Sequence, residues 1–198
     1  MADKVREIVY FEKAGKGNTD KVIEVVAKRL DEGDLDTVIV ASTTGHTALR
    51  LSDALGDKAR MVCVAETALL REWGHEYPCM DPQNKAELER RGVAVADKVA
   101  YLVHSSVLDY SQWKVPTPEI ILRETLYAFG QGLKVAVEVV FIAVASGFVE
   151  PFGDVIAIGG SSRGADTAIV MNATYPNHAF SKDAEKRMRI KEILCKVR

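Results

Sequence analysis

Two loops in this sequence carry the residue types that bind phosphate groups. The first consists of Ser42, Thr43, Thr44 and Gly45 and follows an apolar run. Its hydroxyls can donate hydrogen bonds to an anion, its glycine lets the backbone approach a ligand, and the free N–H groups of a following helix favour negative charge. The same residues fit an ordinary strand-to-helix turn with a threonine cap. Phosphate binding and helix capping are both open for this loop.

The second loop joins two apolar runs and is rich in glycine. Its candidate ligand-binding residues are Gly159, Gly160, Ser161, Arg163, Gly164 and Asp166. A glycine-rich turn can form a nest of backbone N–H groups, and an arginine binds phosphate through two parallel hydrogen bonds. Asp166 could cap the turn or accept a hydrogen bond from a ligand hydroxyl. The alternative is a hairpin with a solvated arginine.

Four further side chains are candidates for acid–base chemistry, namely Lys134, Glu138, His104 and Glu12. If a helix begins near Gly132, Lys134 lies in its first turn, where a positive charge opposes the helix dipole and an anionic ligand would explain it. Glu138 follows at i+4, so a surface ion pair is the alternative. His104 and Glu12 each come directly after a predicted strand, where a side chain can face a ligand crevice.

Histidine and cysteine do not point to a metal site. His75, Glu76 and Cys79 lie close together, but nothing supplies further ligands at a suitable spacing, so we expect no metal. The chain has 3 cysteines and no CxxC motif. This usage indicates a reducing compartment and neither a disulfide framework nor a zinc ribbon.

The hydrophobic pattern predicts the elements that must position these residues. Short apolar runs rich in β-branched residues predict strands at Ile8–Phe11, Thr37–Ala41, Arg60–Ala65, within Val93–Val103, at Asp154–Ile158 and at Thr167–Met171. Apolar residues at helical spacing predict helices from Thr19 to Gly33, from Gly45 to Gly56, at Lys85–Arg91 and at Pro116–Phe129.

Three segments are less regular. Gly132–Val144 is rich in β-formers but too long for a typical strand, and Gly147 after it is a helix C-cap residue, so we predict a buried helix. Thr67–Gln83 contains glycine and prolines and is predicted to be a long loop. Asp183–Val197 is charged with scattered apolar residues and is predicted to be helical.

The alternation of strands and helices predicts an α/β fold. We expect three layers, a mostly parallel mixed sheet with helices on both faces, in a single domain over residues 1–198. The short connection around Gly159–Gly164 predicts an antiparallel hairpin at one edge of the sheet. Ligands bind such sheets outside the carboxyl ends of the strands, so both candidate loops should meet at one rim.

The composition is that of a soluble globular protein. The chain has 198 residues, 47% of them hydrophobic, and 26 basic against 28 acidic residues give a formal charge of −2. These values exclude a disordered or fibrous protein and give no global field for nucleic acid or an anionic membrane. The longest apolar stretch, Val139–Phe148, is well short of the ~20 residues of a membrane span. We therefore expect a cytoplasmic protein without nucleic-acid or membrane partners.

Several motifs resemble one known family. The run Val38–Ala48 and the two strands around the glycine-rich loop are similar to the C-terminal α/β domain of pyruvate kinase. Closer still are the free-standing pyruvate kinase α/β-domain-like proteins of prokaryotes. Their four motifs match Tyr10–Glu12, Ala41–Gly45, Gly130–Glu138 and Gly159–Ala168. The resemblance spans nearly the whole chain and rests on the combination of motifs.

The resemblance implies a pocket for a phosphorylated ligand. The family turn that matches Ser42–Gly45 holds a phosphate of a sugar bisphosphate, and the free-standing group is associated with flavin mononucleotide (FMN). The match adds Gln131 and Gly132 to the candidate cofactor-binding residues. Pyruvate kinase activity is not implied, because its catalytic (β/α)₈ barrel takes about 250 residues and does not fit in this chain.

Three functions follow as hypotheses. The first is binding of a phosphorylated small molecule, of the FMN or sugar-phosphate type, in a crevice at the carboxyl ends of the strands. The second is a small enzyme that uses the same pocket, with Lys134, Glu138, His104 and Glu12 as acid–base groups. The third is an interaction module with a vestigial pocket, for which a homo-oligomer is one form.

Overall fold

The computed structural model describes residues 3, 5–105, 108–113 and 115–198. Within these residues the strands form one seven-stranded sheet in the order β1-β7-β6-β5-β2-β3-β4. β6 runs antiparallel to β5 and β7, and the other neighbouring strands are parallel. The predicted α/β class with a mostly parallel mixed sheet is confirmed. The strands are β1 Val9–Phe11, β2 Thr37–Ala41, β3 Arg60–Val64, β4 Ala94–Ala96, β5 Asp154–Gly159, β6 Thr167–Asn172 and β7 Ile190–Val197.

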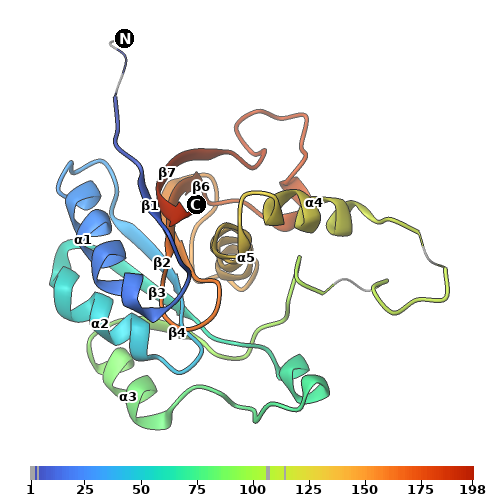
Figure 1. Cartoon of the computed structure of the whole chain (residues 1–198), viewed down its shortest axis with the longest axis horizontal. Coiled ribbons are helices and arrows are strands. Elements are labelled where there is room, and N and C mark those ends of the chain that lie inside the picture. Colours follow the sequence, from blue (N-terminus) through green and yellow to red (C-terminus); the bar gives the residue numbers. More distant parts are fainter. Residues whose placement is uncertain (1–2, 4, 106–107, 114) are drawn as a thin grey trace.

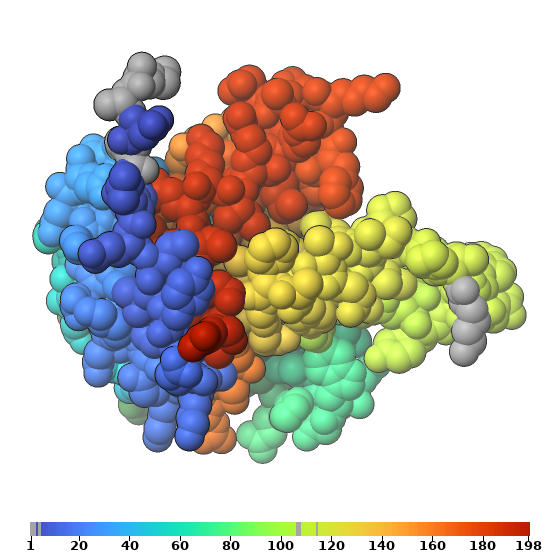
Figure 2. Space-filling view, turned by 45° about the horizontal axis from the view of Figure 1, so that its top comes forward, coloured from blue at the N-terminus to red at the C-terminus, as the bar shows by residue number. Residues whose placement is uncertain are grey.

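Helices cover both faces of the sheet (Figure 1). α1 (Thr19–Leu30), α2 (His46–Leu55) and α3 (Pro82–Arg90) lie on one face, and α5 (Gln131–Ala145) lies on the other. α4 (Pro118–Tyr127) packs on the outer side of α5, and the segment around it stands out from the rest of the molecule (Figure 2). The short 3₁₀ turns are η1 Lys16–Asn18, η2 Gly56–Lys58, η3 Ala68–Trp73 and η4 Pro176–His178.

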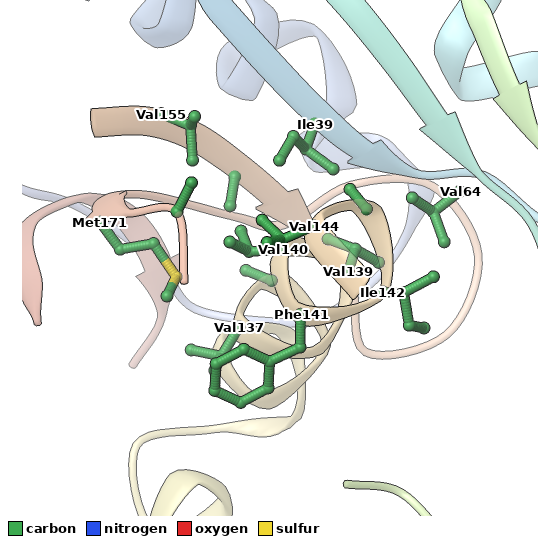
Figure 3. Close-up of a cluster of buried hydrophobic side chains, with 14 of the residues drawn as sticks. Ile39, Val64, Val137, Val139, Val140, Phe141, Ile142, Val144, Val155 and Met171 are labelled. Atoms are coloured by element: carbon green, nitrogen blue, oxygen red, sulfur yellow. The ribbon is translucent and has the colours of Figure 1, made fainter. Parts of the chain in front are cut away.

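The α5 helix is the centre of one of the two hydrophobic cores. Val140 and Phe141 are fully buried, and Figure 3 shows the α5 side chains next to Ile39 of β2, Val155 of β5 and Met171 of β6. Each fully buried side chain of this size contributes about 1.5–3 kcal/mol to folding. The helix is apolar on nearly all sides because the sheet covers one side and α4 the other. The predicted buried helix is confirmed.

The prediction of a helix at Asp183–Val197 is wrong, because Ile190–Val197 forms β7 between β1 and β6. Leu194 and Cys195 are neighbours in sequence and are 5% and 0% exposed, since both faces of this strand are covered. Register shifts against β6 further break the alternation that marks a half-buried strand. Pairing with strands that are distant in sequence therefore determines that this segment is a strand.

The hairpin prediction is half right. β5 and β6 pair antiparallel as expected, but they lie inside the sheet and not at its edge, because β7 pairs with the far side of β6. The predicted loop Thr67–Gln83 contains η3, and α3 begins at its end at Pro82. There Asp81 accepts hydrogen bonds from the N–H groups of the first turn of α3, which the sequence prediction overlooked.

Over the described residues, no helix combines the length and apolar character that a membrane crossing requires. The carboxyl ends of β2, β3 and β5 share one edge of the sheet, because these three strands are parallel. Val40 of β2 lies opposite Ile158 of β5, so the loops after β2 and β5 leave that edge side by side. The expectation that both loops start at one rim is confirmed.

Candidate functional site

The turn after β2, residues 42–45, leads into α2 and also contributes to the crevice described below. The Oγ of Ser42 accepts a hydrogen bond from the N–H of Ala48 in the first turn of α2 (3.3 Å), while the N-cap residue itself is Gly45 and not a threonine. Gly45 has φ 86°, a conformation that favours glycine, and a Cβ there would lie 2.9 Å from the Cβ of Asn84. The carbonyl of Thr44 accepts from the side chain of Asn84 (2.9 Å).

The glycine-rich loop is held by its own buried carboxylate. Asp166 is 1% exposed, and it accepts hydrogen bonds from the N–H of Ser161 and from the hydroxyl of Thr167, both at 2.9 Å. Asp166 therefore closes the turn, which is one of the two roles predicted for it. This geometry needs no ligand to satisfy the carboxylate.

Close packing accounts for the glycines around this loop. A Cβ on Gly132 would collide with the side chains of Thr167 and Asp166, and one on Gly159 would collide with the carbonyl oxygen of Gly132. Similarly, a Cβ on Gly160 would meet the carbonyl oxygen of Gly164. Gly132 and Gly159 leave no room for a side chain because the start of α5 lies against the end of β5 and the start of β6, and Gly160 leaves none because the loop turns back on its own backbone at Gly164.

Arg163 is exposed at the tip of the loop. The tip leans on α1, because the N–H of Ala165 donates to Thr19 (3.1 Å) and Gly164 packs against Thr19 and Lys16. α1 lies on the face of the sheet opposite α5 (Figure 1). Arg163 is not among the described residues that line the crevice beside α5. The two loops share one rim, but among the described residues Ser42 lines the crevice and Arg163 does not.

A crevice of about 100 Å³ opens where β2 and β3 end beside α5. Its polar lining brings together six of the predicted site residues and adds two that were not predicted. The predicted ones are Ser42, Thr43, His104, Gln131, Lys134 and Glu138, and the unpredicted ones are Glu66 and Tyr101.

Lys134 and Glu138 form a buried ion pair in this crevice. They lie at i and i+4 on α5 and are 1% and 4% exposed, so the predicted pair exists but is not on the surface. One oxygen of Glu138 accepts from Lys134. The other accepts from three consecutive backbone N–H groups, those of Leu102 (3.1 Å), Val103 (2.9 Å) and His104 (2.8 Å). Both buried charges thus have the partners that burial demands.

Burial and charge set the pKa values of this pair. Burial lowers the pKa of Lys134, and the negative charge of Glu138 offsets part of that effect. For Glu138, burial alone would raise the pKa, but the charge of Lys134 and the N–H of His104 outweigh it, so the pKa lies below its ordinary value. The carboxylate is therefore ionised at neutral pH.

Aromatic rings surround the ammonium group. The Nζ of Lys134 lies 5.9 Å from the ring centre of Tyr101 and 5.8 Å from that of Tyr127, within cation–π range. The ring of His104 lies 4.7 Å from that of Tyr101. The hydroxyl of Tyr127 is 3.4 Å from the Nδ1 of His104. Burial, and then the charge of Lys134, lower the pKa of His104. Its imidazole is neutral at pH 7 and is available as a base.

Glu66 is a site residue that the sequence reasoning missed. It follows β3, accepts from the hydroxyl of Tyr101, and accepts a long hydrogen bond from Thr43 (3.4 Å). Its position after a buried strand is the signal that identified Ser42, and it could have identified Glu66 as well. Tyr101 carries no comparable signal, because it lies in an irregular segment.

The prediction that Glu12 lies in the pocket is wrong. Its side chain is 80% exposed, and its nearest charged partner is Arg198 at 3.7 Å. It follows β1, at the sheet edge and four strand positions from β2. At the usual strand spacing this is about 19 Å from the crevice. The strand order, which the sequence does not give, decides this placement.

A second hollow of about 320 Å³ adjoins the crevice at the start of α5. Gln131 lines both hollows, and Gly132 and Ser161 line the second one together with Lys196 and Arg198. The second hollow therefore adds two more predicted residues, Gly132 and Ser161, and Gln131 connects it to the crevice.

No protein-family model matches the sequence. In the part of the chain that the structure describes, no three His, Cys, Asp or Glu side chains are grouped as a metal site would require. The described crevice thus offers a neutral imidazole, an ammonium group, two carboxylates and a phenol. These groups suit proton transfer and the binding of a polar ligand.

Proposed function

We propose that this chain binds a phosphorylated small molecule, of the FMN or sugar-phosphate type, in the crevice at the carboxyl ends of β2 and β3. One observation carries the proposal: the Ser42–Thr43 turn and Lys134 line the same crevice at this edge of the sheet. In open α/β sheets, this edge is where ligands bind.

The surroundings of the crevice offer room for the phosphate. Apart from the N–H of Ala48, which donates to Ser42, the first N–H groups of α2 and α5 have no acceptor within their own helices, as at every helix start. α5 begins at Gln131, where the two hollows meet, and the second hollow is lined by Lys196 and by Arg198, whose guanidinium lies 3.7 Å from the exposed carboxylate of Glu12. The phosphate is proposed to lie in the second hollow, and the organic part of the ligand is proposed to enter the crevice.

The four sequence motifs support the same ligand class. Two of them contribute to the crevice, through Ser42 and Thr43 of one and Gln131, Lys134 and Glu138 of the other. Membership of the pyruvate kinase C-terminal-domain-like class is part of the proposal and rests on the motifs. Arg163 is left out of the proposed binding residues because it is exposed at the tip of the β5–β6 loop, which contacts α1.

Calorimetric titration with FMN, glucose 6-phosphate and inorganic phosphate tests the proposal. We expect at least one organic phosphate to bind at micromolar to low millimolar concentration. Thr43→Val should weaken that binding three- to tenfold, the effect of one hydrogen bond. Thr125→Val, on exposed α4, is the matched control and should change nothing. Absence of binding of all three ligands at millimolar concentration would contradict the proposal.

A small acid–base enzyme is the second candidate. It is favoured by the convergence of Lys134, Glu138 and His104 in one crevice, with a neutral imidazole beside an ammonium group. In that case His104 would take a proton from the ligand, and Lys134 would stabilise the resulting oxyanion.

Solvent exchange distinguishes this enzyme from a binding protein. The wild-type protein would incorporate deuterium from D₂O into a carbonyl-bearing sugar phosphate, and His104→Gln would abolish the exchange while binding persists. If the wild type binds such a ligand but never exchanges the carbon-bound hydrogens of the ligand, only the binding function stands.

A further inference from the structure

The charges that line the crevice do not balance. Lys134 and Glu138 neutralise each other through their ion pair. Glu66 is a second carboxylate in the lining, and it forms no ion pair with any residue that the structure describes. His104 adds no positive charge at neutral pH, because burial lowers its pKa. The crevice therefore has one negative charge in excess.

Glu66 is held in place by hydroxyl groups and keeps capacity for more hydrogen bonds. One oxygen accepts from the hydroxyl of Tyr101 and the other from that of Thr43 at 3.4 Å. A carboxylate has about four lone-pair sites. Glu66 can therefore accept from a ligand without losing either partner, while its orientation is fixed.

Beside Glu66 the crevice is lined by the aromatic rings of Tyr101 and His104, and Trp73 packs against both rings. The ring of Trp73 stacks on that of Tyr101 at 6.1 Å and meets that of His104 edge-on at 5.4 Å. An amino group next to aromatic faces gains cation–π attraction, and a carboxylate beside it adds a charge-assisted hydrogen bond. A phosphate in the same place would face an unpaired carboxylate of like charge.

We infer that Glu66 recognises an amino or ring N–H group of the phosphorylated ligand and keeps the phosphate group out of the crevice. This inference rests on the proposed function and specifies it: the nitrogen-bearing end of the ligand lies against the carboxylate of Glu66, with the rings of Tyr101 and His104 beside it. The phosphate end then lies beyond Gln131, toward the second hollow. The ligand class is a phosphorylated compound with an N–H donor, not a plain sugar phosphate.

A matched pair of ligands tests the inference on the wild-type protein. Glucosamine 6-phosphate and glucose 6-phosphate differ only in an amino group in place of a hydroxyl. We expect the wild type to bind the amino sugar phosphate about tenfold more tightly, the usual gain from a hydrogen bond between charged groups. Equal affinities, or a preference for glucose 6-phosphate, would overturn the inference. If neither sugar binds, the affinity for FMN, which carries a ring N–H group, is compared between the wild type and Glu66→Gln.

The variant Glu66→Gln separates charge from shape. It should abolish the preference for glucosamine 6-phosphate and weaken FMN about tenfold, and it should leave inorganic phosphate unchanged. Glu66→Asp keeps the charge and should retain part of the preference, so a folding defect in one variant does not decide the outcome. Glu72→Gln, on exposed η3, is the control. A gain in phosphate binding by Glu66→Gln without loss of FMN would show that the phosphate enters the crevice.

The proposed function and this inference fail in different ways. If the wild type binds none of the four ligands, the proposed function is wrong. If it binds phosphorylated ligands and Glu66→Gln binds each of them as the wild type does, binding stands and the role of Glu66 is wrong.

Discussion

The glycine-rich loop and the crevice beside α5 both hold buried polar groups, but they use them differently. In the loop, Asp166 accepts hydrogen bonds from Ser161 and Thr167 and closes the turn. In the crevice, Glu138 and Lys134 hold each other, while Glu66 and His104 line an open space. The loop is the more conspicuous in sequence, yet its special residues serve packing.

This difference shows what a glycine-rich motif can mean. Gly132 and Gly159 are required because the start of α5 lies against the end of β5 and the start of β6. That contact also sets the position of Lys134, two residues after Gly132 on the same helix. The loop therefore supports the crevice indirectly, by fixing α5, and the groups able to do chemistry lie on α5 and on the segments that face it.

Removing the carboxylate of Glu138 should have the largest effect on stability. Glu138→Ala leaves the buried Lys134 without its partner and three backbone N–H groups without an acceptor. Breaking a buried pair in this way costs about 3–5 kcal/mol. Urea unfolding measures the loss, with exposed Glu124→Ala as a control near zero. A loss below about 1 kcal/mol for Glu138→Ala would show that the pair does not hold this region together.

Adding a methyl group at the contact between loop and helix should have the next largest effect. Gly132→Ala places a Cβ against Thr167 and Asp166, and relief of the overlap costs about 1–3 kcal/mol. Gly17→Ala is the matched control, because no atom lies within 4 Å of its Cβ. Thermal unfolding of both variants measures the difference. If Gly132→Ala is as stable as Gly17→Ala, close packing does not explain the glycine.

The loss of stability in acid should depend on Glu138, and this effect should be smaller than the two above. The pKa of Glu138 is lower in the folded protein than its ordinary value near 4.3. The ionised carboxylate therefore stabilises fully above that value, and its contribution is lost as pH falls through the folded pKa. When the pH is lowered below about 4, the thermal unfolding midpoint of the wild type should fall. The midpoint of Glu138→Gln should fall less over the same range. Parallel pH curves would contradict a stabilising ionised Glu138.

Removal of the exposed arginine should have the smallest effect. Arg163→Ala lies at a loop tip beside α1, so the free energy of unfolding should change by less than about 0.5 kcal/mol. Ligand affinity should change less than twofold, in contrast to Thr43→Val. A tenfold loss of affinity for a phosphorylated ligand would restore Arg163 to the site and make the loop, not the crevice, its centre.

Local patterns were sufficient for most of the fold. β2 is a continuous apolar run, and α1 and α2 show helical spacing with glycine after them, so their positions were predicted from neighbours in sequence. β7 was missed because its burial depends on β1 and β6, which lie far away in the chain. Strand order is a property of the whole sheet, and this is why the hairpin was placed at an edge.

The site was predictable where a residue directly follows a buried strand or lies on α5. Ser42, Lys134 and Glu138 were identified by such positions. Glu12 met the same criterion and lies elsewhere, because β1 is at the sheet edge. Tyr101 and Tyr127 reach Lys134 only through tertiary packing, which no spacing in the sequence reveals.

The central claim is that a phosphorylated ligand binds in the crevice beside α5. Titration of the ¹⁵N-labelled protein with FMN, followed through backbone amide shifts, tests it most directly. We predict saturable shifts at the crevice amides of Thr43, Glu66, His104, Gln131 and Gly132 and at those of Lys196 and Arg198 in the second hollow. Shifts confined to the tip of the glycine-rich loop, or no saturable shift at millimolar FMN and glucosamine 6-phosphate, would contradict the claim.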